Sequence, residues 1–271
     1  MKKIFLLILI INCIIVKSQS DLLIAPFRVV FEDGKTIEEV SVANTGKDTA
    51  RYTISFLQYK MEEDGVLKQI EQPEEKILFA DKYLRIFPRS IVLAPNESQI
   101  VRLQVKTAAN MLSAEYRSHL YFRSVVDEKP LLENSEDTAA VGIKLIPVYG
   151  ISIPVIIRLG ELAVTASIDN VRIVPGDNNS KFLHFDILRS GEKSTFGQIE
   201  VFYVDVAGKS TLVGKAKGVA VYTPLLLRKF NLSLAVSELI DFSSGSLKIV
   251  YSSTGTKDEI IYFEHIYKLD N

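Results

Sequence analysis

The stretch from Leu145 to Arg158, LIPVYGISIPVIIR, has no charged side chain before its final arginine. A β-branched run of this length favours a strand, and on a bare sheet edge the unpaired N–H and C=O groups of such a strand recruit other strands. The run therefore needs a pairing partner. That partner is either the second sheet of the protein itself or a strand supplied by another protein.

Two prolines divide this run. Proline has no N–H group and occurs in sheets at edges, strand starts or bulges. Pro147 and Pro154 have opposite parity, so in one uninterrupted strand one of them would face its neighbour with no hydrogen to donate. Gly150 adopts bulge conformations at little steric cost. We therefore expect two strand halves, Ile143 to Tyr149 and Ile151 to Arg158, joined by a bend at this glycine.

The first residues have the pattern of a secretory signal peptide over positions 1–20. A basic start precedes an apolar run from Ile4 to Val16 and a small polar exit. We expect cleavage after Ser18 or Ser20. A transmembrane anchor is the alternative, but it needs roughly 20 apolar residues and this run is shorter.

Cysteine and charge exclude several function classes. Cys13, the only cysteine of the 271 residues, lies in the signal, so the mature chain has no thiol for a disulfide, a zinc-thiolate site or a cysteine nucleophile. The net charge is −1 and no basic block is present, which argues against nucleic acid as a partner.

Beyond the signal, short β-rich runs are broken by turn residues at the spacing typical of sandwiches. We predict an all-β protein of two tandem β-sandwich domains, at 21–159 and 160–271, with a hinge near Gly160. Only Ala108 to Ala114 has the pattern of a helical turn, and the acidic segment Asp127 to Ala140 is expected to be a mobile surface loop. The expected strands are Leu22 to Phe31, Ile37 to Val42, Arg51 to Tyr59, Ile91 to Leu93, Ile100 to Val105, Ser118 to Val126, Leu162 to Val174, Phe182 to Leu188, Gln198 to Asp205, Thr211 to Tyr222, Phe230 to Leu234, Ser246 to Tyr251 and Glu259 to Tyr267.

Enzyme signatures are scarce. His119, His184 and His265 form no metal-spaced pair and are expected to be structural. The sequence contains neither G-x-S-x-G nor H-E-x-x-H, and the segment around Gly208 lacks the first glycine of a phosphate-binding loop. We therefore expect no catalytic residues, no metal, no cofactor and no small-molecule substrate.

Arg28 is the most informative polar residue, because it falls within the expected first strand, IAPFRVVF. A buried, unpaired cation there would be costly. Its side chain either points to solvent or forms a planar donor fork that is ready to bind a carboxylate. Its position alone does not choose between the two.

Several segments together resemble the PapD-like periplasmic pilus (fimbrial) chaperones. They are IAPFRVVFEDGKTIEEVSVANTG, FPRSIVLAPNESQIVRL, EYRSHLYFRSV, the acidic loop and ISIPVIIR, with a weaker match at GVAVYTPLLLRKFNLSL in the second domain. The resemblance implies a boomerang of two immunoglobulin-like domains in the periplasm, whose cleft receives a pilus subunit, with an outer-membrane usher as a possible second partner.

In that family, an arginine of the first strand binds the C-terminal carboxylate of the subunit, and the last strand of the first domain completes the unfinished sandwich of the subunit. The resemblance assigns the first role to Arg28. It assigns the strand-pairing role to Leu145, Pro147, Tyr149, Ile151 and Ile153, while a slip of one residue would give Ile146 and Val148 instead.

One position departs from the family pattern. The second carboxylate anchor of the family is a lysine, and Pro154 falls on its position. Either another cation replaces that lysine, with Arg89, Arg117 and Lys144 as candidates, or carboxylate capture is weaker here.

The expected function is therefore an ATP-independent chaperone that caps pilus subunits during fimbria biogenesis. The alternative is an extracellular or surface β-sandwich adhesion or carbohydrate-binding protein that has no client. The sequence also leaves open whether the free protein shields its apolar strand by self-association.

Overall fold

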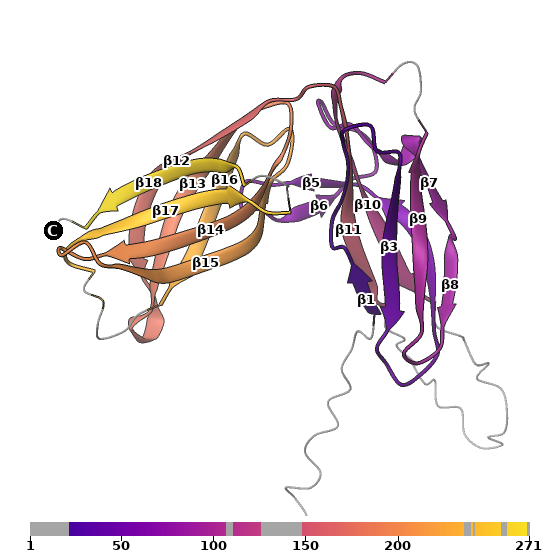
Figure 1. Cartoon of the computed structure of the whole chain (residues 1–271), viewed down its shortest axis with the longest axis horizontal. Helices are drawn as coiled ribbons and strands as arrows, with labels where there is room; N and C mark the ends of the chain where they lie inside the picture. The colour runs from indigo at the N-terminus through magenta and orange to yellow at the C-terminus, as the bar shows by residue number, and fades with distance from the viewer. Residues whose placement is uncertain are drawn as a thin grey trace, which may run out of the picture.

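The computed structural model describes residues 22–106, 111–125, 148–235, 240, 242–255 and 259–269. In this part of the chain the regular elements are strands, apart from two short 3-10 helices. Figure 1 shows two lobes of strands that meet at an angle in a boomerang outline. Each lobe has its own apolar core. The expected all-β fold of two tandem sandwiches is therefore confirmed.

The first sandwich packs a four-stranded sheet against a five-stranded sheet. The four-stranded sheet has the order β1 (Leu22–Ala25), β3 (Ile37–Asn44), β9 (Ser98–Val105) and β7 (Leu84–Phe87). The five-stranded sheet has the order β2 (Val29–Phe31), β11 (Gly150–Leu159), β10 (Ala114–Ser124), β4 (Ala50–Leu57) and β8 (Ser90–Leu93). A 3-10 turn, η1 (Asp81–Tyr83), precedes β7, and a separate hairpin is formed by β5 (Tyr59–Met61) and β6 (Leu67–Gln69).

The second sandwich packs a three-stranded sheet against a four-stranded sheet. The former has the order β12 (Val164–Pro175), β13 (Lys181–Gly191) and β16 (Leu227–Leu234), and the latter β15 (Ser210–Val221), β14 (Thr195–Val204), β17 (Ser246–Ser253) and β18 (Ile261–Lys268). The 3-10 turn η2 (Asp177–Asn179) joins β12 to β13. Each strand expected after residue 160 is present, with its ends shifted by a few positions.

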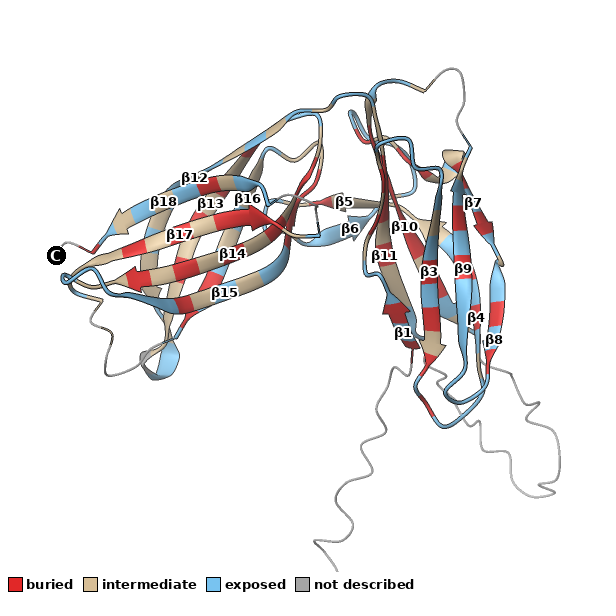
Figure 2. Ribbon diagram, viewed as in Figure 1, coloured by how far each residue is buried: buried red, intermediate tan, exposed pale blue. Residues whose placement is uncertain are grey.

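Alternation of apolar and polar side chains explains why each sheet has one buried face. Figure 2 shows buried and more exposed residues alternating along strands such as β3, where Val40 and Val42 are fully buried and Glu39 and Ser41 are exposed. The period of two sends every second side chain to the interior. Each fully buried Val, Leu or Ile contributes roughly 1.5–3 kcal/mol, and the two cores, which contain no disulfide, depend on this burial.

The first expected strand is in fact two strands. β1 pairs antiparallel with β3, whereas β2 pairs parallel with β11 in the opposite sheet. The chain changes sheets at the segment that contains Pro26, whose missing N–H cannot serve a ladder. The prediction that Arg28 lies inside a strand is therefore wrong, because it lies between the two strands, directly before β2.

Several other expectations are corrected or fall outside the described residues. The helical turn expected up to Ala114 is wrong for its described part, because residues 111–113 are irregular and Ala114 begins β10. The second predicted strand half is confirmed, because β11 starts at Gly150 and continues without interruption through Pro154 to Leu159. The bend at Gly150 stays a prediction, because most of the first strand half lies outside the described residues. The signal peptide, the acidic loop and residues 143–147 lie outside the described residues. No helix in the described part of the chain is long and apolar enough to span a membrane.

The two sandwiches share a small apolar contact. Met61 from the β5–β6 hairpin and Ile156 from β11 are buried against Ala220 and Tyr222 from the end of β15 and the residue after it. This contact places one face of the five-stranded sheet against the second sandwich. The charged side chains on that face therefore lie at the interface between the lobes.

Candidate functional site: an open strand edge and a cationic cradle

β11 has an edge that is only partly paired. On one side it pairs with β10 along its whole length, from Gly150 to Leu159. On the other side β2 covers only Val155 to Ile157. Among the described residues, no strand pairs with the segment Gly150 to Pro154 on that side. Such an edge presents backbone donors and acceptors that a further strand can use.

The hydrogen bonds to β10 show which backbone groups this edge offers. Ser124 N donates to Tyr149 O (2.8 Å), and Tyr149 N donates to the Ser124 hydroxyl (3.1 Å), so the backbone groups of Tyr149 point to β10. Because these directions alternate along a strand, the N–H and C=O groups of Gly150 and Ser152 point to the open edge. Pro154 faces the same way but offers only its carbonyl.

The side chains expected to pair with a subunit form one row, and this row leaves the core towards the N-terminal end of β11. Ile153 is 2% exposed inside the first core, Ile151 packs at its margin, and Tyr149 is 42% exposed. The side chain of Ile153 therefore belongs to the protein's own core. Leu145 and Pro147 continue this parity but lie outside the described residues.

A mainly apolar cavity lies where this row leaves the core. Its volume is about 190 Å³, and its lining includes Tyr52, Phe122, Tyr149 and Ile151. These residues come from β4, β10, β11 and the segment before β11. The first sandwich is thus open at the end to which the unpaired part of β11 leads.

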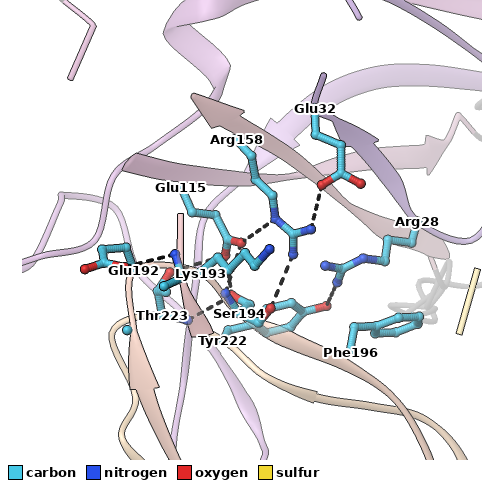
Figure 3. A network of polar contacts seen from close by, with 12 residues as sticks. Arg28, Glu32, Glu115, Arg158, Glu192, Lys193, Ser194, Phe196, Tyr222 and Thr223 are labelled. Carbon is cyan, nitrogen blue, oxygen red and sulfur yellow. Dashed lines mark hydrogen bonds and ion pairs between the residues drawn. The ribbon is translucent and has the colours of Figure 1, made fainter. Parts of the chain in front are cut away.

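Arg28 lies at the other end of the open edge. Val29 is level with Val155 in the parallel pair, and continuing this register by one residue places Arg28 level with Pro154. Figure 3 shows the Arg28 side chain directed at the second sandwich. Its Nη1 donates to the Tyr222 hydroxyl (3.3 Å), and its guanidinium carbon is 4.4 Å from the centre of the Phe196 ring. The side chain is half-buried, so part of it remains accessible to solvent.

Arg117 on β10 contributes a second cation to the same place. Its guanidinium carbon is 4.1 Å from the centre of the Tyr222 ring, and that of Arg28 is 5.7 Å from the same centre. Its Nη2 donates to the Tyr59 carbonyl (3.0 Å), while its buried Nη1 has no hydrogen-bond partner in the structure. Burial lowers the pKa of Arg117 to about 10, so its guanidinium stays charged at neutral pH.

His119 lies next to these arginines. Its ring meets the Tyr59 ring edge-on at 4.8 Å, and neither ring nitrogen has a hydrogen-bond partner in the structure. Burial, followed by the charges of Arg117 and Arg28, lowers the pKa of His119 to about 3. The imidazole is therefore neutral at physiological pH. We call Arg28, Arg117 and His119, with the Tyr222 ring, the cationic cradle.

A second polar cluster joins the two sandwiches further along the same face. Arg158 Nε donates to Glu115 (3.0 Å) and its Nη1 to Glu32 (2.9 Å). Ser194 of the second sandwich donates to Glu115 through its backbone N–H (3.0 Å) and its hydroxyl. Figure 3 shows this network beside Tyr222 and Thr223. Burial alone would raise the pKa of Glu115, but Arg158 and Ser194 outweigh it and lower that pKa.

The β5–β6 hairpin forms a further bridge between the sandwiches. Its turn receives a backbone hydrogen bond from Lys229 N to Glu63 O (2.6 Å), and Lys229 Nζ pairs with the Glu63 carboxylate (2.7 Å). Gly65 lies against the Arg228 guanidinium, where a Cβ atom would approach to 2.5 Å. Figure 1 shows the hairpin between the two lobes. Sequence reasoning missed this bridge, because its two sides are more than 150 positions apart.

The other candidate residues are placed as follows. Arg89 is exposed and directly precedes β8, at the edge of the five-stranded sheet opposite β2, so it is remote from Arg28. Lys144 lies outside the described residues. His184 lies on β13 and His265 on β18, in different sheets of the second sandwich. Among the described residues, no group of three His, Cys, Asp or Glu side chains could hold a metal ion.

The fold and site define a protein of two β-sandwiches in which a partly unpaired strand edge ends at a cationic cradle between the sandwiches. No family model and no curated protein matches the sequence. Several solved structures of pilus chaperones are similar to it. The CupB2 chaperone of Pseudomonas aeruginosa is 15% identical over 91% of this chain and 100% of that chain, with a TM-score of 0.45.

Two further similar structures are complexes. One is the CsuC–CsuE chaperone–tip adhesion subunit complex of Acinetobacter baumannii, with 15% identity, 90% of this chain and 98% of that chain covered, and a TM-score of 0.45. The other is the SafA pilin with the SafB chaperone of Salmonella enterica, with 15% identity, coverage of 93% and 98%, and a TM-score of 0.40. Because these identities and TM-scores are low, the function proposed below rests on the residues of this chain.

Proposed function

We propose that this protein is a periplasmic chaperone that binds and caps fimbrial subunits. It lends the exposed edge of β11 to a subunit that lacks a strand, and Arg28 binds the C-terminal carboxylate of that subunit. The observation that carries this proposal is the unpaired edge from Gly150 to Pro154, which ends level with Arg28. A strand edge gives affinity through backbone hydrogen bonds, and the cation marks where the bound strand must end.

The charge of Arg28 favours one direction for the bound strand. A client strand that pairs with this edge lies on the same side of β11 as β2, next to the N-terminal end of β2, where Arg28 is found. β2 itself runs parallel to β11. If the client strand is also parallel to β11, its C-terminus meets Arg28, whereas an antiparallel strand brings its N-terminus there. The arginine attracts a terminal carboxylate and repels a terminal ammonium group, so the parallel direction is favoured.

The side-chain row on β11 explains how the client core is completed. Ile153 fills the protein's own core, and the row becomes exposed at Tyr149. Leu145 and Pro147 have the same parity as Tyr149, so they would enter the core of the subunit. A few such side chains, at roughly 1.5–3 kcal/mol each, together with the backbone ladder, are enough to hold the complex. Neither binding nor release needs ATP, because the subunit is released when a better-fitting strand takes the place of β11.

Signal-directed export and an outer-membrane usher belong to the same proposal. The expected signal peptide delivers the chain to the compartment in which pilus subunits fold. The usher would receive the capped subunits. No catalytic group takes part in this function, because strand exchange makes and breaks only non-covalent contacts.

The test is capture of a client by the tagged mature protein from the periplasm of its own host. Wild type is compared with Arg28→Ala and with Ser152→Pro, which removes an N–H from the open edge but none that bonds to β10. Ser152→Ala is the matched control for the side chain, and Arg85→Ala, on the far sheet, is the control for charge.

We expect wild type and both controls to recover a small secreted β-rich subunit, and Arg28→Ala and Ser152→Pro to lose it. If capture is the same with Ser152→Pro as with Ser152→Ala, the strand-lending mechanism is wrong. If wild type recovers no such subunit while surface fibres are being made, the surface adhesion or carbohydrate-binding alternative becomes the better account.

A further inference from the structure

Gly150, the first residue of β11, leaves a gap that a side chain of the neighbouring strand fills. Tyr121 of β10 points away from the first core, because Leu120 and Phe122 on either side of it are fully buried in that core. We call this side of the five-stranded sheet its outer face. A Cβ atom added at Gly150 would overlap the Cε2, Cζ and hydroxyl oxygen atoms of Tyr121. The far end of the tyrosine ring therefore lies over the backbone of Gly150.

The ring carries its hydroxyl from β10 across to the open edge of β11. Tyr121 is level with Ser152 in the antiparallel pair, so the ring reaches Gly150 diagonally. On the other side of Gly150, no strand in the described part of the chain pairs with β11. A client strand there would lie about 4.8 Å beyond β11. The Tyr121 hydroxyl is therefore within reach of client side chains, although Tyr121 belongs to the second strand from the client.

The Tyr121 hydroxyl is free to take a new partner. Within the described residues it makes no hydrogen bond, and the side chain is partly exposed. A phenol hydroxyl can both donate and accept. A client strand on the open edge would remove water from this group, and a buried hydroxyl without a partner is costly. The edge therefore favours a client side chain that restores a hydrogen bond and disfavours one that cannot.

The two faces of the open edge differ in chemistry. On the core side of β11, Ile151 and Ile153 form an apolar row. On the outer face, a client strand would contact the half-buried Ser152 and the hydroxyl end of Tyr121. A strand with alternating side chains thus meets apolar groups on one side and hydrogen-bonding groups on the other. Apolar burial contributes affinity on the core side, and the outer face is where a hydrogen bond is gained or lost.

We propose that Tyr121 is a specificity-determining residue, which selects client strands that carry a hydrogen-bonding side chain, such as serine, threonine, asparagine or glutamine, beside Gly150. This inference rests on the proposed function, because it assumes that a client strand pairs with the open edge. Gly150 acts indirectly, since its missing side chain lets the Tyr121 hydroxyl lie at the edge. Arg28 recognises the end of the client strand, and Tyr121 recognises a side chain a few residues before that end.

The experiment removes the hydroxyl from the protein and from the client in a double-mutant cycle. The probe is a heptapeptide of alternating valine and serine, with a fluorescent label on its N-terminus and a free C-terminal carboxylate. It is also made with each serine replaced in turn by alanine. Dissociation constants are measured by fluorescence anisotropy for the mature wild type and for Tyr121→Phe. Tyr267→Phe, on β18 of the second sandwich, is the control for loss of a tyrosine hydroxyl.

We expect one of the alanine peptides to bind wild type and Tyr267→Phe roughly tenfold more weakly than the parent peptide. The same replacement should have almost no effect on binding to Tyr121→Phe. If every alanine peptide loses as much affinity for Tyr121→Phe as for wild type, the inference is overturned and the strand edge remains. If wild type binds no peptide, or Ser152→Pro binds the parent peptide as tightly as wild type does, the proposed function itself fails.

Gly150→Ala gives a second test that keeps the hydroxyl. Gly150 is not among the residues with positive φ, so its backbone accepts alanine, and the new Cβ displaces only the flexible end of Tyr121. We expect this variant to lose the tenfold serine preference as Tyr121→Phe does, because the hydroxyl no longer lies at the edge. Full retention of the preference by Gly150→Ala contradicts the inference.

Discussion

His119 gives a direct test of the electrostatics of the cradle. Its imidazole is buried between tyrosine rings and beside two arginines, which lowers its pKa to about 3 from the model-peptide value of 6.5. The folded protein therefore keeps this histidine neutral in weak acid, whereas the unfolded chain takes up a proton below pH 6.5. Stability linked to His119 is fully present above pH 6.5 and is lost progressively as the pH falls towards 3.

The magnitude follows from the difference between the two pKa values. At pH 5 the unfolded chain has gained about 2 kcal/mol from protonation of this one histidine, and at pH 7.5 almost nothing. Ordinary carboxylates titrate mainly below this range, and the lowered pKa of Glu115 affects stability only near and below its usual value of 4.5. The interval from pH 7.5 to 5 therefore lies above the range in which these carboxylates affect stability, and comparison with a variant that lacks the imidazole isolates the contribution of His119.

The assay is urea unfolding at several pH values across this interval, for wild type and for His119→Phe. Phenylalanine keeps the ring contact with Tyr59 but cannot be protonated. We expect the free energy of unfolding to fall by about 2 kcal/mol more in wild type than in the variant between pH 7.5 and 5. NMR of the imidazole in the folded protein provides a second readout. Equal pH slopes, or an imidazole that titrates near pH 6.5, would refute the electrostatic account of the cradle.

Two further predictions concern the bridges between the sandwiches. Glu115→Ala leaves Arg158 without its buried partner and removes the acceptor of Ser194, so it should lower the free energy of unfolding by about 3–5 kcal/mol in urea titrations; a loss below 1 kcal/mol would mean that the network is not important for stability. Gly65→Ala should destabilise the protein by more than Gly34→Ala, since both glycines have positive φ but only Gly65 lies against Arg228. Equal changes in melting temperature for these two variants would contradict a tight hairpin contact.

The sequence was sufficient for most of the strands and for the two-sandwich class, although it did not predict β6 or β7. Alternation of apolar residues in segments such as Ile37 to Val42 is a local signal, and a period of two specifies a strand with one buried face regardless of what it packs against. The uncharged stretch that ends at Arg158 likewise indicated, without a structure, a strand that needs a partner. The sequence also placed Pro154 inside the second strand half, and β11 tolerates this proline because its edge is partly open there.

The composition of the candidate site was only partly predictable. Arg28 was identified because a cation near apolar strand residues is conspicuous in the sequence. Its companion Arg117 was one of three candidates that the sequence could not rank, and the structure places it beside the same tyrosine ring. His119 was expected to be structural, and no sequence signal marked it as part of a cradle.

Tertiary structure decided what local patterns could not encode. Arg28, Arg117 and Tyr222 come from the segment before β2, from β10 and from the residue after β15, and only the docking of the two sandwiches brings them together. The same holds for Glu115 and Ser194, which meet across that interface. Side-chain periodicity is determined by neighbours in the chain, whereas charge pairing in a cleft depends on distances between distant segments. The sequence therefore determined most of the strands and the strand that needs a partner, and the packing of the two domains determined where charge accumulates beside it.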